Sequence, residues 1–222
     1  MIKLFGLITR RPDMTPEAFH DHYRHPHGTL ALKMTTLRGY VQSHQLHSDL
    51  LDTNQARFEA VAEIWLDNES DVVTFREEPN LVRYLIPDEP NFIDMSKSGF
   101  VATTETPVDM AAPPSSEADG FWSPASRPFS IKLIQLVLHD GAWFGDEDAA
   151  LAGEIGALRH VRCAPVAAFQ PEKPEFFGVR ELWWPTLAAF RAGVGGAPGA
   201  WRRLQEITGP SVSLLAQAER LI

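Results

Sequence analysis

The chain has 222 residues, of which 44% are hydrophobic and 22% are charged, and its formal net charge is −9. This composition can bury a core, and the length allows two units of about 100 residues each, so long disorder is not expected. The negative charge and the absence of any long cluster of Lys or Arg argue against nucleic-acid binding.

The chain opens with a predicted strand at residues 2–9, a weakly alternating apolar run that leads into Arg10 and Arg11. This order is the reverse of a signal peptide, and no segment approaches the roughly twenty apolar residues needed to cross a bilayer. The single cysteine, Cys163, excludes an internal disulfide and any zinc or iron–sulfur site with several thiolate ligands. We therefore expect a cytoplasmic protein with no membrane partner.

A helix is predicted from Thr15, because Thr is a favourable N-cap residue and is followed by Pro16 at the first helical position and by Glu17 in the first turn. Pro26 removes an amide donor and restricts the residue before it. We expect a kink or a break at this proline, followed by a second helix that ends at about residue 37.

The other elements of the first half complete a β-α-β-β-α-β unit, which is the split βαβ pattern. Their residue types and spacing predict strands at 39–46 and 58–65, a helix at 69–76 and a last strand at 100–104.

The second half repeats this order. IKLFGLI at 2–8 recurs as IKLIQLV at 131–137, and VAEIW at 61–65 is echoed by VRELW at 179–183. A repeat with a period of half the chain changes the number of folding units that must be considered. The elements predicted here are helices at 146–158 and 185–194 and strands at 131–138, 161–169, 176–183 and 211–216.

A Pro-rich and Ser-rich linker at 107–128 separates the two copies, and its Phe121 and Trp122 are expected to pack against a domain. The chain thus divides into a domain at 1–106, this linker, and a domain at 129–222. Two helices would cover one face of each four-stranded sheet and leave the other face bare. The predicted fold class is α+β, with tandem ferredoxin-like units closing on each other as an intramolecular pseudo-dimer.

The first half resembles the EthD family over residues 1 to about 104. The resemblance rests on LITRRPDMTPEAF at 7–19, on Tyr23 and His27, on GYVQSH at 39–44, and on DEPNFID at 88–94. It implies a dimeric α/β barrel in which the second half, which lacks the motif, is a degenerate partner. It also implies a cofactor-independent lyase, polyketide cyclase-like enzyme or isomerase. Haem-binding or cofactor-free monooxygenases of the same superfamily are the alternative.

His27 is the leading catalytic candidate. It follows Pro26 at the start of the predicted second helix, where the positive helix end favours a neutral imidazole, and a neutral imidazole can act as a general base near pH 7. By resemblance it also matches the histidine of the family. The competing interpretation is a surface or packing histidine.

Three polar residues alternate along the second predicted strand, so they share one face. This row either lines a cavity, where Tyr40 and His44 would polarise a carbonyl oxygen, or forms the solvated face of the sheet. Asp88 either brings a carboxylate toward His27 or is a turn residue. Expected substrate contacts are Tyr23, Gln42, Asp94 and Trp65.

Two other clusters have simple structural interpretations. His20, His22, His25 and His27 suggest a metal, but their spacing does not ensure three ligands, and we expect no metal and no cofactor. Lys and Glu recur at matching positions of the first and third strands of each half, where cross-strand ion pairs explain them. A buried carboxylate that shuttles protons is the functional alternative for the second cluster, which comprises Lys3, Glu63, Lys132 and Glu181.

Together these features favour an enzyme that acts on a small aromatic or polyketide-like carbonyl compound through His27. The competing hypothesis is a barrel that holds a small aromatic or apolar molecule without converting it. Association of two chains into a homodimer is left open, as is the face of the sheet that holds the cavity.

Overall fold

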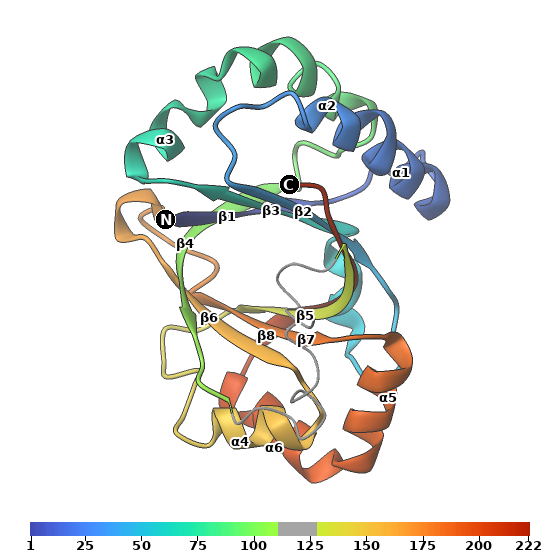
Figure 1. The fold of residues 1–222 in the computed structure, drawn as a ribbon, viewed down its shortest axis with the longest axis vertical. Helices are drawn as coiled ribbons and strands as arrows, with labels where there is room; N and C mark the ends of the chain where they lie inside the picture. Colours follow the sequence, from blue (N-terminus) through green and yellow to red (C-terminus); the bar gives the residue numbers. More distant parts are fainter. Residues whose placement is uncertain (111–127) are drawn as a thin grey trace.

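A computed structural model of the chain describes residues 1–110 and 128–222. Most of the predicted linker, including Phe121 and Trp122, lies outside the described residues. Within them, both halves contain strands and helices in the predicted order (Figure 1). No helix in these two ranges has the length and apolar character that crossing a membrane requires.

The strands in the described residues agree with the predicted ones to within a few residues at most ends. The largest differences are at β4 and β8, which extend beyond their predicted ends because the added residues pair with strands of the other half. The strands are β1 (Ile2–Ile8), β2 (Gly39–Gln45), β3 (Ala60–Leu66), β4 (Gly99–Pro107), β5 (Phe129–Val137), β6 (Arg159–Pro165), β7 (Gly178–Trp184) and β8 (Ser211–Arg220).

The helices differ more from the prediction. His25 has extended backbone angles, as the residue before a proline prefers, so the expected break is present. The second helix ends after three residues instead of reaching residue 37, and α6 was not predicted. The helical elements that matter below are α1 (Pro16–His22), the π-helical turn η1 (Tyr23–Gly28), α2 (Thr29–Ala31), α3 (Glu69–Thr74), α4 (Asp148–Glu154), α5 (Leu187–Gly196) and α6 (Pro198–Thr208).

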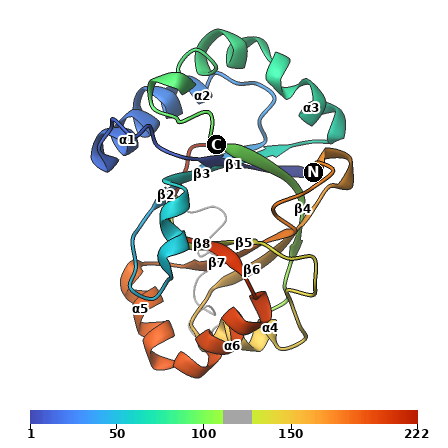
Figure 2. The same cartoon turned by 180° about the vertical axis from the view of Figure 1, so that it is seen from behind.

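Each half forms a four-stranded antiparallel sheet, with strand order β4-β1-β3-β2 in the first half and β8-β5-β7-β6 in the second. The two sheets cover one another, as the duplication predicts. Their outer strands also pair, β2 with β8 and β4 with β6, so the eight strands form one closed barrel. The helices of the two halves lie on opposite sides of this barrel (Figures 1 and 2).

The inside of the barrel is a packed core to which both halves contribute. Burial of apolar side chains from both sheets in one cluster stabilises their association. Members of this cluster include Phe5, Leu7, Val61, Ile134, Val179 and Leu214.

Candidate active site

The candidate site lies between the α1–η1 segment and the outer, helix-covered face of the first-half sheet. α1 begins as predicted, because the Thr15 hydroxyl accepts a hydrogen bond from the amide of Ala18 (3.2 Å). Phe19 and Tyr23 lie one turn apart, are fully buried, and pack on Phe92 with ring centroids 5.6 and 5.9 Å away. This aromatic contact holds the helix against the protein.

Tyr40, Gln42 and His44 point toward α1 and η1 from alternate positions of β2. They are not solvated, since 3%, 1% and 2% of their surfaces are exposed. The Gln42 side-chain amide donates to the Tyr40 hydroxyl (3.0 Å) and to the backbone carbonyl of Tyr23 (2.7 Å). The row therefore fastens η1 to the sheet, and it faces the helices instead of the space between the two sheets.

His27 is buried, and its Nδ1 lies 3.0 Å from Oδ2 of Asp88. The other oxygen of Asp88 lies 2.9 Å from Nε2 of His22. The predicted helix dipole does not act on His27, because α2 has only three residues. Asp88 holds the ring instead. A carboxylate at Nδ1 fixes the orientation and tautomer of an imidazole and leaves Nε2 for a substrate.

A second pair of histidines lies beside Tyr23, where Nδ1 of His20 is 2.9 Å from Nδ1 of His44. Burial, then the nearby Arg24 and His20, lowers the pKa of His44 to about 2, so this imidazole is neutral at neutral pH. Its Nε2 lies 3.7 Å from Glu219, and a neutral imidazole makes no ion pair there. Glu219 is paired with Arg24 instead, at 2.8 Å.

The two tyrosines of the site keep their phenolic protons. Burial raises the pKa of Tyr40 to about 12 and places the pKa of Tyr23 well above its usual value, so both hydroxyls can donate at neutral pH. Within residues 1–110 and 128–222, the Tyr23 hydroxyl, Gln42 Oε1 and His44 Nε2 are buried and have no hydrogen-bond partner. Buried polar atoms are nearly always satisfied, so a ligand or water is expected at these atoms.

Two of the predicted substrate contacts do not join this group. Trp65 belongs to the set of β3 residues that face the barrel interior, and its indole N–H donates to Glu105 (2.8 Å). The side chain of Asp94 accepts from the backbone and the hydroxyl of Ser96 in its own turn (3.1 and 2.6 Å). The carboxylate that reaches His27 is Asp88, which is also the turn residue that the sequence indicated.

The four histidines of the α1–η1 segment do not converge on one point. His20 meets His44, while His25 bonds to the hydroxyl of Thr29 (2.7 Å). His22 and His27 share Asp88. The arrangement places them with different partners and does not form the metal site that their spacing suggested.

The predicted Lys–Glu pairs lie inside the barrel, at the end where β1 and β5 begin. The pairs within each half are present, Lys3–Glu63 at 2.8 Å and Lys132–Glu181 at 3.1 Å. Shorter contacts join the halves, Lys3–Glu181 at 2.6 Å and Lys132–Glu63 at 2.5 Å. All four residues are buried, so this network connects the two sheets through charge as well as through apolar packing.

The two carboxylates of this network are not equivalent. Burial alone would raise the pKa of Glu63, but Lys132 and Lys3 hold it well below its usual value. Burial raises the pKa of Glu181. Among the described residues, Glu181, Glu105 and Cys163 place potential metal ligands within 4.8 Å of one another. Lys3 already supplies a cation to both carboxylates, and burial raises the pKa of the Cys163 thiol.

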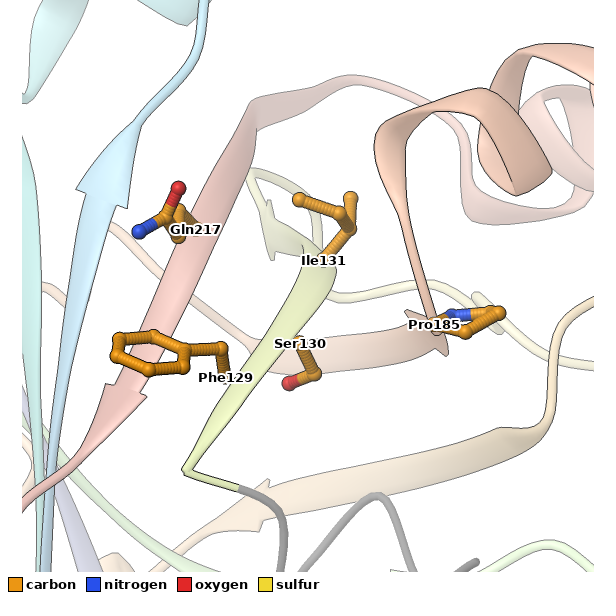
Figure 3. A pocket seen from close by; sticks show the side chains of 5 residues that line it. All are labelled: Phe129, Ser130, Ile131, Pro185 and Gln217. Carbon is orange, nitrogen blue, oxygen red and sulfur yellow. The ribbon is translucent and has the colours of Figure 1, made fainter.

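A shallow pocket of ≈ 270 Å³ lies at the seam between the two halves (Figure 3). Gln217 of this pocket is opposite His44 in the β2–β8 pair, and its side-chain amide donates to Glu219 (2.9 Å), the carboxylate beside His44. The pocket and the site therefore share a wall. Its lining residues are Phe129, Ser130, Ile131, Pro185 and Gln217.

The EthD domain family matches residues 11–96. This range includes α1, η1, β2, β3 and Asp88. Residues 11–96 are an EthD domain. The EthD domain thus provides His27, its carboxylate partner and the polar row of β2. Glu219 comes from the second half of the chain, outside the EthD domain.

Solved structures similar to the chain show the fold. An anthrone oxidase-like protein has a TM-score of 0.61 at 14% sequence identity, with 99% of this chain and 93% of that chain covered. A proposed monooxygenase from Lactobacillus acidophilus NCFM has a TM-score of 0.46 at 9% identity, with 100% and 93% covered. The fold is that of the dimeric α/β barrels, here with both units in one chain. No curated protein matches the chain.

The pH dependence of stability should report on Asp88 in the EthD domain. Burial acts to raise its pKa, but the hydrogen bonds from His27 and His22 lower it to about 2. Because this is below the unfolded value of about 3.9, the stabilisation is present above roughly pH 4 and is lost as the pH falls toward 2. Urea unfolding at a series of pH values should show a shallower acid loss for Asp88→Asn. The exposed Asp21→Asn should match the wild type.

Proposed function

We propose that the chain is a cofactor-independent acid–base enzyme that removes a proton beside the carbonyl group of a small aromatic or polyketide-like compound. The observation that carries this proposal is the buried His27–Asp88 hydrogen bond, which lies in an EthD domain next to the tyrosine hydroxyls. The pair supplies an oriented base, and the hydroxyls supply hydrogen-bond donors.

The chemical step follows from these roles. Nε2 of His27 takes the proton from the carbon, and the electron pair of the broken C–H bond moves into the carbonyl group to form an enolate. Tyr40 or Tyr23 donates a hydrogen bond to the enolate oxygen, since both phenols are protonated at neutral pH. Return of the proton to another carbon is an isomerisation, and attack of the enolate carbon on a second carbonyl is a cyclisation.

The pocket at the seam supports a small, largely apolar substrate. Phe129, Ile131 and Pro185 offer apolar surface, while Gln217 is the polar residue that leads toward Glu219 and His44. Small-molecule sites commonly combine such apolar walls with a few polar groups. The net charge of −9 makes a polyanionic substrate unfavourable by simple repulsion.

Hydrogen–deuterium exchange at carbon tests the proposal directly. The full chain is incubated in D₂O with hydroxyanthrones, aromatic β-diketones and linear polyketide-like β-carbonyl compounds, and deuterium incorporation is followed by mass spectrometry. The hydroxyanthrones are chosen because an anthrone oxidase-like protein shares the fold. We expect exchange above the buffer rate for at least one class. A compound that raises the melting temperature without exchange would favour the non-catalytic binding barrel instead.

A further inference from the structure

The second half carries a different set of polar residues at the position equivalent to the candidate site. Val41 and Val161 are opposite Glu63 and Glu181 in the two halves, which aligns β2 with β6. By this register His160 stands where Tyr40 stands in the first half. Arg162 likewise takes the position of Gln42, so both face α4 from the outer side of the barrel.

Arg180 completes this group from β7, directly opposite Arg162 in the strand pair. It is fully buried, and its Nη2 donates to the backbone carbonyl of Trp143 (2.7 Å) and to Oδ2 of Asp148 (2.8 Å). Nε of Arg162 lies 3.9 Å from the same carboxylate. Asp148 is thus the carboxylate that these contacts provide for two guanidinium groups.

Several buried nitrogen atoms of this cluster have no hydrogen-bond partner in the described part of the chain. They are Nε and Nη1 of Arg180, Nε of Arg162, and both ring nitrogens of His160. Burial, then Arg180 and Arg162, lowers the pKa of His160 to about 3, so its ring is neutral. The two arginines and one aspartate leave an excess of one positive charge, and unpaired buried charge and donors are costly.

We propose that Arg162, Arg180 and His160 form a binding site for the carboxylate group of a small monoanion. A planar guanidinium matches the two oxygens of a carboxylate, and the neutral imidazole adds one further N–H donor. One negative charge balances the one excess positive charge, whereas a phosphate dianion would overcompensate it. This site is in the other half of the chain and does not depend on the proposed function.

Solvent can reach the cluster beside Arg162, whose side chain is 27% exposed. The Arg162 guanidinium lies over the ring of Phe144, 4.5 Å from its centroid, and Phe144 is itself exposed. Trp143 packs edge-on to Phe144. An aromatic carboxylate could place its ring near these aromatics while its charged group reaches Arg180.

Calorimetric titration of the full chain with benzoate, acetate and inorganic phosphate at constant ionic strength tests the site. We expect saturable one-site binding of benzoate, and weaker binding by about tenfold or more in Arg162→Gln, because a charge-assisted hydrogen bond is lost. Arg191→Gln makes the same change of charge at an exposed position of α5 and should keep the affinity within about twofold.

A second measurement does not depend on heats of binding. Benzoate should raise the melting temperature of the wild type and of Arg191→Gln but not that of Arg162→Gln. It should also shift the ring NMR signals of His160 and leave those of the exposed His25 unchanged. Tighter binding of phosphate than of either carboxylate would overturn the ligand class. Absence of saturable binding, or equal weakening by both substitutions, would overturn the site.

Discussion

Replacing Lys132 with Met should lower the free energy of unfolding by ~3–5 kcal/mol, because it removes one partner of a buried ion network. Nζ of Lys132 lies 2.5 Å from Glu63 and 3.1 Å from Glu181, and both carboxylates are fully buried. After the substitution, Lys3 remains as the lysine that contacts both. Urea unfolding followed by tryptophan fluorescence at pH 7 measures the loss.

Lys97→Met is the matched control, since this lysine pairs with Asp94 at 3.3 Å on the surface and its side chain is 66% exposed. Surface pairs contribute about 0–1 kcal/mol, so the control should unfold nearly as the wild type does. Adding Glu63→Gln to Lys132→Met removes a stranded carboxylate and should recover part of the stability. A loss for Lys132→Met of no more than about 1 kcal/mol would show that the network contributes little more than a surface pair.

Replacing His27 with Gln should lower the rate of proton removal by ~10²–10⁴-fold, the usual contribution of a positioned general base. Glutamine is polar and similar in size, but it cannot accept a proton at neutral pH. The deuterium-exchange assay measures the change with whichever compound the wild type exchanges. The melting temperature of each variant should be measured alongside, because His27 is buried and bonded to Asp88.

His25→Gln is the natural control for this experiment. His25 lies two residues away, is exposed, and contacts only the hydroxyl of Thr29 among the described side chains that it meets, so exchange should be unaffected. Asp88→Asn should reduce the rate less than His27→Gln, since it misorients the base without removing it. A reduction below tenfold for a folded His27→Gln would remove His27 from the mechanism.

Much of the fold could be predicted because the chain contains it twice. The recurrence of Lys3 and Glu63 as Lys132 and Glu181 aligned the strands of the halves, and the ion pairs within each half followed from that alignment. The contacts that join the halves could not be predicted, since they depend on how the barrel closes. α6 was missed although its sequence contains signals for it: Pro198 suits the first helical position, and Ala200 and Leu204 are spaced for one buried face.

The candidate site was partly predictable for a local reason. Alternation along one strand places Tyr40, Gln42 and His44 on one face whatever lies opposite, but it does not show that α1 and η1 cover that face. The contact between His27 and Asp88 spans 61 residues, and turn chemistry alone could not choose between Asp88 and Asp94. Glu219 offered no signal at all, because its place beside His44 exists only once β8 pairs with β2.

The pairing of β2 with β8 also has a consequence for synthesis of the chain. About 165 residues separate the two strands, and at roughly 5–20 residues per second a ribosome needs on the order of ten seconds or longer to supply β8. During that interval the backbone N–H and C=O groups on one side of β2 lack their partner and can template another strand. Nascent chains that stop before β8 are therefore the form of this protein most prone to aggregate.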